Sequence, residues 1–187
     1  MKKYLMPSLK LTLALIILLA VIYPLFIAAV GKLTPGGGNG ETVKVNGKVV
    51  GYAKVGQKFT DDKYFWSRPS AVDYNAAGSA GSNKGPTNPD YLKTVQDRID
   101  TFLVHNPGVN KKDIPAELVT ASGSGEDPDL SPVAAKIQVK RVAVIRGITE
   151  ARLNKLIDDH TQGPLLGFLG PSKVNVLKLN VALDDLK

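Results

Sequence analysis

The chain has 187 residues, a formal net charge of +7 at pH 7 and no cysteine. This length allows one globular domain with its own core beside a membrane segment, and the missing cysteines exclude a disulfide-built scaffold and a lipid-anchored lipoprotein. Lysines and arginines are dispersed among aspartates and glutamates without a basic stripe interleaved with aromatic residues, so we expect no nucleic-acid partner.

The first element is an apolar segment long enough to cross a membrane. Residues 11–30 read LTLALIILLAVIYPLFIAAV, twenty residues without a charge. As a helix they span about 30 Å, the thickness of a bilayer core. The alternative is a cleavable signal peptide, whose apolar region is normally about 7–15 residues. Because this run is longer, we interpret residues 1–10 as a short tail and residues 11–30 as a retained transmembrane helix in contact with membrane lipid.

The charges that flank this segment indicate its orientation. Lys2, Lys3 and Lys10 precede it, whereas Lys32 is the only charge in the ten residues that follow. Basic residues concentrate on the cytoplasmic side of membrane helices. We therefore expect a single-pass protein of the cell membrane, with a cytoplasmic N-terminus and an extracytoplasmic soluble domain.

A glycine-rich linker at residues 31–41 leads into the soluble domain, which we assign to residues 42–187. The linker contains TPGGGNG, a composition typical of flexible chain. The domain opens with two β-branched runs around Asn46-Gly47, a dipeptide that predicts a β-hairpin with a type I′ turn. From Tyr64 the chain has little periodicity for about thirty residues, and a loop of such length is usually functional or bound to a partner.

Helix signals dominate the next part of the chain. Asp90 predicts a cap for a helix over residues 91–105. Ser131, with Pro132 at the first helical position, predicts another helix that continues to Gly147. In both patterns a side chain that can accept a hydrogen bond from the first turn of a helix precedes an apolar stripe.

The remaining signals mix strands with helices. Residues 117–121 predict a short strand, and Thr149 predicts the cap of a further helix that closes near Gln162. Residues 173–187 alternate apolar and polar positions, which predicts a strand followed by a short helical turn. Since the order has no βαβ rhythm, we predict the α+β class, with a single N-terminal transmembrane helix followed by one mixed α+β globular domain.

The segment VTASGSGEDPDLSP at residues 119–132 was tested for chemistry. Ser122 and Ser124 lack the GxSxG pattern, and the two histidines, His105 and His160, lie near predicted helix ends, where a structural role is expected. The carboxylates Glu126, Asp127 and Asp129 lack the spacing of a calcium loop. We interpret this segment as a turn that leads into a helix.

Two further motifs could carry a function. GSAGSNKG at residues 78–85 departs from a P-loop, because Asn83 replaces the second glycine and Gly85 stands where serine or threonine should bind magnesium. With two histidines and no cysteine, we expect no transition-metal site. Trp66 beside Arg68 has two interpretations that stay open: an anchor for a partner interface, or a core tryptophan with a capping arginine.

Several segments taken together resemble one family. YFWSRPSAVDYNAAGSAGSNKGPTNP, IPAELVTASGSGEDPDLSP, AAKIQVKRVAVIRG and VNVLKLNVALDDL, behind a single N-terminal span, are similar to the C subunit of the Kdp-type potassium-transporting P-type ATPase. The resemblance covers essentially the whole chain. Glu126 and Lys84 depart from it, since the family pattern has an apolar residue at both places.

The resemblance implies a non-catalytic accessory subunit of a high-affinity, ATP-driven potassium uptake pump. Its partners would be a potassium-selecting, channel-like subunit, a P-type ATPase subunit and a small membrane subunit. The family subunit is described as an assembly factor and as a catalytic chaperone that raises the affinity of the ATPase subunit for ATP. No tightly bound cofactor is implied. A contact with ATP is implied by the resemblance alone, and Gln162 in HTQGPL is the matching position.

The residues expected at a partner interface are Trp66, Arg68, Ser122, Asp127 and Pro128. We expect the soluble domain to dock over the potassium-selecting subunit. If that domain lies outside the membrane, none of its side chains meets cytoplasmic ATP, and an effect on ATP affinity would be a coupling free energy passed through the membrane. The alternatives from other classes are a membrane-anchored extracytoplasmic serine hydrolase and a ligand-binding module.

Overall fold

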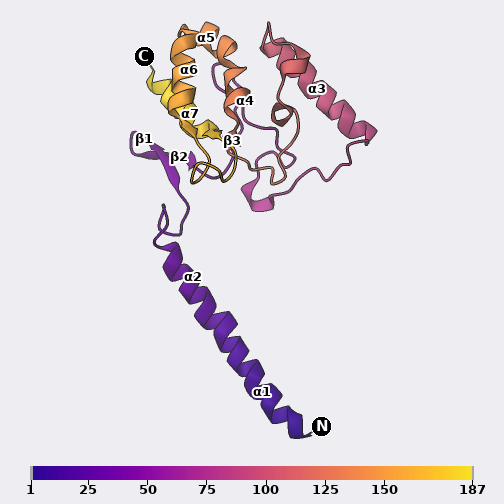
Figure 1. Ribbon diagram of the computed structural model, residues 1–187, viewed down its shortest axis with the longest axis vertical. Coiled ribbons are helices and arrows are strands. Elements are labelled where there is room, and N and C mark those ends of the chain that lie inside the picture. Colours follow the sequence, from indigo (N-terminus) through magenta and orange to yellow (C-terminus); the bar gives the residue numbers. More distant parts are fainter. Residues whose placement is uncertain (1, 187) are drawn as a thin grey trace. The chain divides into compact units, whose positions relative to one another are not determined.

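The computed structural model describes residues 2–186, and the chain falls into two compact units. The first unit ends at Thr42 and the second begins at Val43. The first unit is one long helix with the linker that follows it, whereas the second unit contains all the remaining helices and strands (Figure 1). The second unit mixes helices with short strands, as the predicted α+β class requires.

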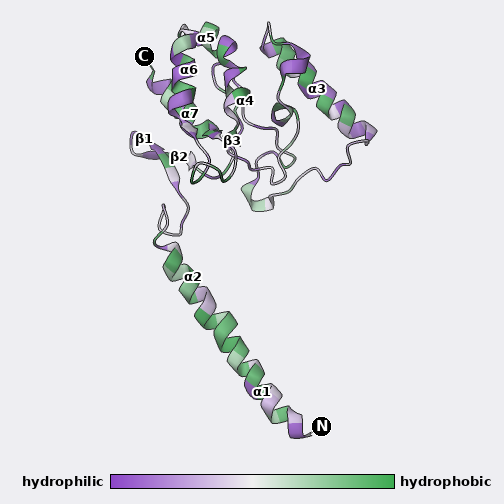
Figure 2. Ribbon diagram, viewed as in Figure 1, coloured by the Kyte–Doolittle hydropathy of each residue, from purple (hydrophilic) through white to green (hydrophobic). Residues whose placement is uncertain are grey.

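The N-terminal helix is continuous and apolar. It consists of α1 (Lys2–Ile16), a π-helical segment (Ile17–Ile22) and α2 (Tyr23–Gly31). The π-helical segment precedes Pro24, which has no N–H to donate, and the N–H of Tyr23 bonds to the carbonyl oxygen of Leu18 five residues earlier. Figure 2 shows hydrophobic residues along most of the helix.

This helix is consistent with single-pass membrane anchoring. The segment Lys3–Gly31 is long and apolar enough to cross a membrane, and none of its most apolar stretch is buried inside the protein. It starts earlier than the predicted span of residues 11–30, because the preceding residues continue the same helix.

A β-hairpin opens the second unit. β1 (Thr42–Val45) pairs with β2 (Lys48–Tyr52). Between them Asn46 and Gly47 have φ angles of 50° and 78°, the two positive values that a type I′ turn requires. The predicted hairpin is therefore confirmed. The chain that follows is irregular as far as residue 88, apart from a short 3₁₀ helix at Ala76–Gly78.

The helix α3 (Pro89–His105) begins two residues before the predicted start. Its cap is Asn88, whose side chain accepts a 3.0 Å hydrogen bond from the N–H of Tyr91. The prediction of Asp90 as the cap was wrong. Pro89 fits the first helical position, and Asp90 lies in the first turn, where a carboxylate favours the positive end of the helix dipole.

The next predicted strand is wrong, and the next predicted helix is interrupted. Residues 117–121 contain part of a 3₁₀ turn, Ala116–Leu118, which follows another at Lys111–Asp113. The helix that Ser131 caps is confirmed at its start, but it divides into α4 (Pro132–Lys136) and α5 (Val139–Arg146). α5 ends at Gly147, whose φ of 64° is the left-handed cap expected of glycine.

The C-terminal part differs most from the sequence prediction. Thr149 caps α6 (Glu150–Asp159) as predicted. The alternating segment forms a strand only at β5 (Lys173–Asn175), after which α7 (Val176–Asp185) is helical. Asn175 causes the switch, because its side chain accepts a 3.0 Å bond from the N–H of Lys178 and so caps α7. The predicted long strand was therefore wrong.

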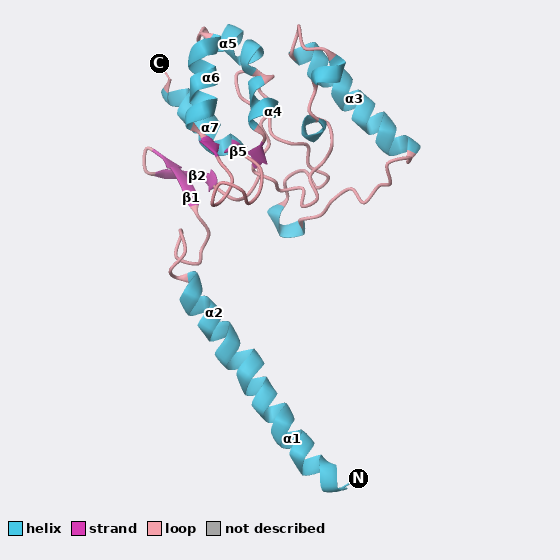
Figure 3. Ribbon diagram, viewed as in Figure 1, coloured by secondary structure: helices cyan, strands magenta, loops and turns pink. Residues whose placement is uncertain are grey.

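The central sheet is small and antiparallel. β5 lies between β3 (Asp129–Leu130) and β4 (Thr161–Gln162). Asp129 stands opposite Asn175, and Thr161 opposite Val174. Figure 3 shows α4 to α7 grouped beside this sheet, with α3 separated from them by irregular chain.

The second unit has two apolar clusters. The larger one joins α5, α6 and α7 around Phe65, which is completely buried although it belongs to the irregular segment. The smaller one contains Phe102 of α3 and Val176 of α7, with Trp66 packed against it. Consecutive residues of one irregular segment thus connect both clusters, and this segment positions the site described next.

Candidate functional site

The segment Asp61–Trp66 is fixed to the helices by side chains that bond its backbone. The N–H of Phe65 donates to Asn180 Oδ1, and Asn180 Nδ2 donates to the carbonyl oxygen of Phe65, both at 2.9 Å. The N–H of Trp66 donates to Gln138 Oε1 at 2.8 Å. Within the described chain, the segment has no neighbouring strand to bond its backbone. The buried side chains of Asn180 and Gln138 supply these hydrogen bonds instead.

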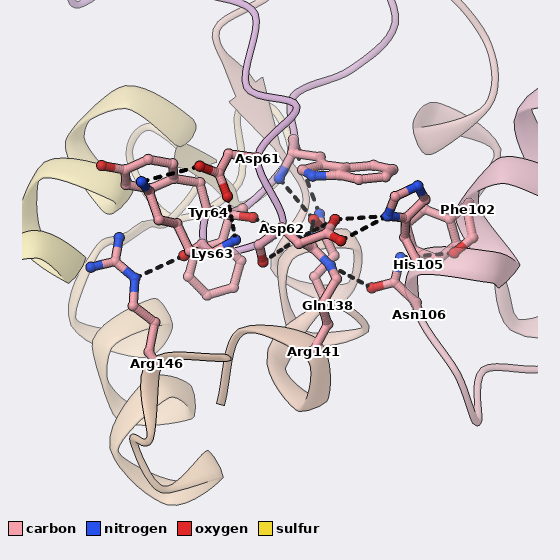
Figure 4. A network of polar contacts seen from close by, with 12 residues as sticks. Asp61, Asp62, Lys63, Tyr64, Phe102, His105, Asn106, Gln138, Arg141 and Arg146 are labelled. Atoms are coloured by element: carbon pink, nitrogen blue, oxygen red, sulfur yellow. Dashed lines mark hydrogen bonds and ion pairs between the residues drawn. The ribbon is translucent and has the colours of Figure 1, made fainter. Parts of the chain in front are cut away.

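Arg141 of α5 lies at the centre of this arrangement (Figure 4). Its guanidinium donates to Asn106 Oδ1 at 3.0 Å, to Gln138 Oε1 at 2.7 Å and to the carbonyl oxygens of Asp62 and Tyr64 at 2.5 and 2.9 Å. Burial lowers the pKa of Arg141 to about 10, which leaves the side chain charged at neutral pH.

Trp66 is held between cationic and aromatic neighbours. The guanidinium carbon of Arg141 lies 4.7 Å from its ring centroid, and the ring of His105 lies 4.9 Å away. His105 Nδ1 is 2.8 Å from Asp62 Oδ2, and the two side chains face each other in Figure 4. These contacts give the indole one orientation, a property of anchor residues at interfaces.

A cavity of about 550 Å³ opens beside this tryptophan, between α3 and residues 58–74. Its apolar wall comprises Phe59, Trp66, Phe102 and Leu118. Its lining also contains the charged or titratable side chains of Lys58, Asp73, Asp97, Arg98 and His105. A cavity that combines an apolar wall with charged side chains suits a side chain of a partner protein or a small ligand.

The other predicted interface residues lie on the neighbouring loop. Arg68 Nη1 forms a 2.7 Å ion pair with Asp127 Oδ2, and both side chains are half-buried. The carbonyl oxygen of Pro128 accepts a 2.9 Å bond from the N–H of Val176. Ser122 is 3 % exposed, and its N–H donates to the carbonyl oxygen of Pro69 at 3.2 Å. The structure thus joins Arg68 with Asp127, whereas Ser122 lies inside the fold.

Residues 119–132 pack against residues 70–81. Ser79 Oγ donates to the carbonyl oxygen of Ser124 at 2.9 Å. Gly125 has a φ of 72°, and a Cβ there would lie 2.8 Å from the carbonyl oxygen of Ala80. Tyr74 donates its hydroxyl hydrogen to the carbonyl oxygen of Arg68, and burial raises the pKa of Tyr74 to about 12. This side of the unit is therefore an ordered set of loops.

The serine residues of this loop have no histidine partner. In the described part of the chain, Ser124 Oγ accepts from the N–H of Glu126, His105 contacts Asp62, and His160 Nδ1 lies 2.9 Å from the carbonyl oxygen of Leu156. The arrangement holds no serine–histidine pair of the kind that nucleophilic catalysis needs.

Comparison with protein families distinguishes an ATPase subunit from the alternatives of a serine hydrolase and a ligand-binding module. The family model described as "KdpC: K+-transporting ATPase, c chain" matches residues 5–185. The chain belongs to the KdpC family. This confirms the resemblance seen in the sequence, and it makes the chain a non-catalytic accessory subunit of that ATPase.

Curated KdpC relatives align over almost the whole chain. The "Potassium-transporting ATPase KdpC subunit" of Flavobacterium johnsoniae is 59% identical, covering 99% of this chain and 100% of that protein. The proteins of the same name from Flavobacterium psychrophilum and Bacteroides fragilis are 58% and 53% identical, with 96% and 99% of this chain covered and 96% and 98% of the relatives.

Gln162, which the KdpC resemblance associates with nucleotide, lies away from the cavity. It is exposed, belongs to β4 and stands opposite Lys173 of β5. Lys173 is engaged with Asp129 at 2.6 Å. The nucleotide role of Gln162 therefore stays a prediction.

Glu126 is the buried residue that sequence reasoning could flag only as a departure from the KdpC pattern. Both of its carboxylate oxygens are buried, and neither has a hydrogen-bond partner among the described residues. A buried polar group without a partner costs about 1–3 kcal/mol. We expect Glu126→Leu to raise the free energy of unfolding of the second unit by about 1–2 kcal/mol, measured by thermal or chemical denaturation of the full chain in detergent.

Glu117→Leu is the matched control for this prediction. The Glu117 carboxylate accepts hydrogen bonds from the N–H and hydroxyl of Ser131, the cap of α4. The control should therefore lower the free energy of unfolding, by about 1 kcal/mol. A loss of stability in Glu126→Leu equal to that of the control would show that the Glu126 carboxylate is satisfied in solution.

Proposed function

We propose that this chain is the accessory subunit that assembles and stabilises a high-affinity, ATP-driven potassium uptake pump. Its membership of the KdpC family over residues 5–185 carries this proposal. Relatives named as potassium-transporting ATPase subunits align with 99% and 96% of the chain, which supports the same role here. A single apolar helix cannot by itself enclose a pore, which agrees with ion selection by a partner subunit.

The cavity beside Trp66 is the proposed site at which this chain binds the potassium-selecting subunit. An apolar side chain from an exposed loop of that subunit would enter the cavity and pack against Phe59, Trp66 and Phe102. Binding energy at interfaces concentrates where such a side chain enters a pocket beside tryptophan and arginine. The ion pairs and ring contacts around Trp66 support this proposal, because they hold the pocket in shape before binding.

The effect on ATP affinity is proposed as coupling between subunits. With the second unit on the extracytoplasmic side, its contact with the potassium-selecting subunit would favour one conformation of the pump, and the ATPase subunit would bind ATP more tightly in that conformation. Couplings of this kind typically change affinity about 5- to 150-fold. Direct contact through Gln162 is the second candidate, and the exposure of this side chain favours it.

Filling the cavity tests the docking point. Thr101 of α3 lines the cavity, whereas Val104 of the same helix is 78 % exposed and does not. Thr101→Trp should reduce co-purification of the potassium-selecting subunit with this chain at least tenfold, because the indole occupies the partner's place. Val104→Trp, the control, should leave co-purification unchanged. Equal recovery of the complex with both variants would place the docking surface elsewhere.

The two routes to ATP affinity are separated by one further variant. Gln162→Ala should leave the KM of the complete pump for ATP unchanged if coupling alone operates. A rise in that KM, with assembly intact, would favour direct contact with nucleotide.

A further inference from the structure

An exposed apolar turn projects from the sheet of the second unit. Residues Leu165–Leu169, here called the apolar tip, lie between β4 and β5. The N–H groups of Leu165 and Leu169 each donate to the carbonyl oxygen of the other at 2.9 Å. Leu165, Leu166, Phe168 and Leu169 are 69, 75, 74 and 50 % exposed. Hydrogen bonds thus hold four large apolar side chains in water, an arrangement that usually marks a contact surface.

The backbone of the apolar tip supports this interpretation. Leu166 has a φ of 55°, a left-handed conformation that side chains other than glycine, asparagine and aspartate rarely adopt. Strain of this kind persists where the surrounding structure enforces it, and such positions cluster at functional sites. The turn therefore maintains the exposure of its leucines at a conformational cost.

The segments that flank the apolar tip and form the hairpin contain no acidic residue of their own, although Lys173 pairs with Asp129 of β3. No aspartate or glutamate occurs from Thr161 to Leu183, and none occurs from Thr42 to Thr60. In the second of these stretches the hairpin residues Lys44 and Lys48 are exposed, together with Lys54 just after β2. Asn175 Nδ2 of β5 donates to the carbonyl oxygen of Ala53 at 2.7 Å, so the hairpin is fixed to the strand that leads from the tip.

The linker after the N-terminal helix limits how far the second unit can move from a membrane. Between the helix, which ends at Gly31, and β1 lie residues 32–41. Ten residues extend to at most about 35 Å. With the helix in the bilayer, the start of β1 stays within this reach of the membrane surface, so an apolar turn on the same unit would meet the bilayer at high effective concentration.

We propose that the apolar tip inserts into the boundary between headgroups and acyl chains of the bilayer that the N-terminal helix crosses. Lys44, Lys48 and Lys54 lie over anionic headgroups, as basic residues around an inserted apolar segment do. Lipid fits this surface better than a protein partner, since the tip offers apolar side chains without polar groups for specific recognition. The second unit thereby gains a second attachment that fixes its orientation to the membrane.

The absence of cysteine makes a direct test available. Leu166→Cys in the full chain takes a single environment-sensitive fluorophore, and Lys155→Cys at an exposed position of α6 is the matched control. Both proteins are reconstituted into nanodiscs of phosphatidylcholine with phosphatidylglycerol, with and without a nitroxide on the upper acyl chain. We expect blue-shifted emission at position 166 and nitroxide quenching at least threefold stronger than at position 155.

A second position and a charge variant complete the test. Phe168→Cys should report the same insertion as Leu166→Cys, and replacing Lys44, Lys48 and Lys54 by glutamine should reduce insertion when phosphatidylglycerol is present. Emission and quenching at both tip positions equal to those of the control would overturn the proposal. Shielding that arises only with the other pump subunits, without nitroxide quenching, would assign the tip to a protein interface and would also overturn it.

Discussion

Replacing Arg141 by methionine lowers the free energy of unfolding of the second unit by about 3–5 kcal/mol, the range for one partner removed from a buried charged network. The substitution leaves acceptors on Asn106, Asp62 and Tyr64 without their donor. It also removes the cation above the Trp66 ring. For a unit of this size the midpoint of thermal unfolding should fall by roughly 10 °C.

Lys140→Met is the control for Arg141, because it removes a charge from the adjacent and exposed position of α5. It should change the free energy of unfolding by less than about 0.5 kcal/mol. Arg141→Lys should lose less stability than Arg141→Met but more than the control. An ammonium group cannot reach all the acceptors that the planar guanidinium bonds. Wild-type stability in Arg141→Met would contradict the central position given to this side chain.

Asn180→Ala should cost about 2–4 kcal/mol, because it leaves both the N–H and the carbonyl oxygen of Phe65 buried without partners. Phe65 is completely buried, so water cannot replace the amide without opening the larger apolar cluster. The variant should also shift the fluorescence of Trp66, the only tryptophan, since Asn180 fixes the residue before it.

Asn154→Ala is the matched control for Asn180. Its amide donates to the carbonyl oxygen of Glu150 within α6, at the surface. We expect a change below about 0.5 kcal/mol in the free energy of unfolding and unchanged tryptophan emission. If both asparagine variants behaved alike, the segment around Phe65 would be held by its apolar contacts and not by Asn180.

Local chemistry made part of the fold predictable. The turn at Asn46-Gly47 and the caps at Ser131 and Thr149 depend on residues within a few positions, and all three are confirmed. The C-terminal helix carried a usable signal as well: Asn175 stands ahead of apolar residues at helical spacing. Its cap was overlooked because the same residues also alternate like a strand.

The site depended on contacts that the sequence does not display. Phe65 and Asn180 are 115 residues apart, and Arg141 bonds the backbone at Asp62 across 79 residues. An arginine in an amphipathic helix is expected to be solvated, so nothing local marked Arg141 as buried. The interruption between α4 and α5 also involves a distant contact. Gln138, which lies at the interruption, accepts a hydrogen bond from Trp66, 72 residues earlier. Trp66 was recognised from its residue type, whereas the cavity beside it was not.

Removal of this chain from the intact pump tests its proposed accessory role. The complete complex is purified under mild detergent through a tag on this chain, and the complex expressed without the chain is purified through a tag on the ATPase subunit. Potassium-stimulated ATPase activity of both is measured against ATP concentration. We predict that the potassium-selecting and ATPase subunits co-purify with this chain, and that its removal dissociates the complex or raises the KM for ATP at least fivefold. Recovery of the chain alone, with potassium-stimulated activity and KM unchanged in its absence, would contradict a role in assembly and in ATP affinity.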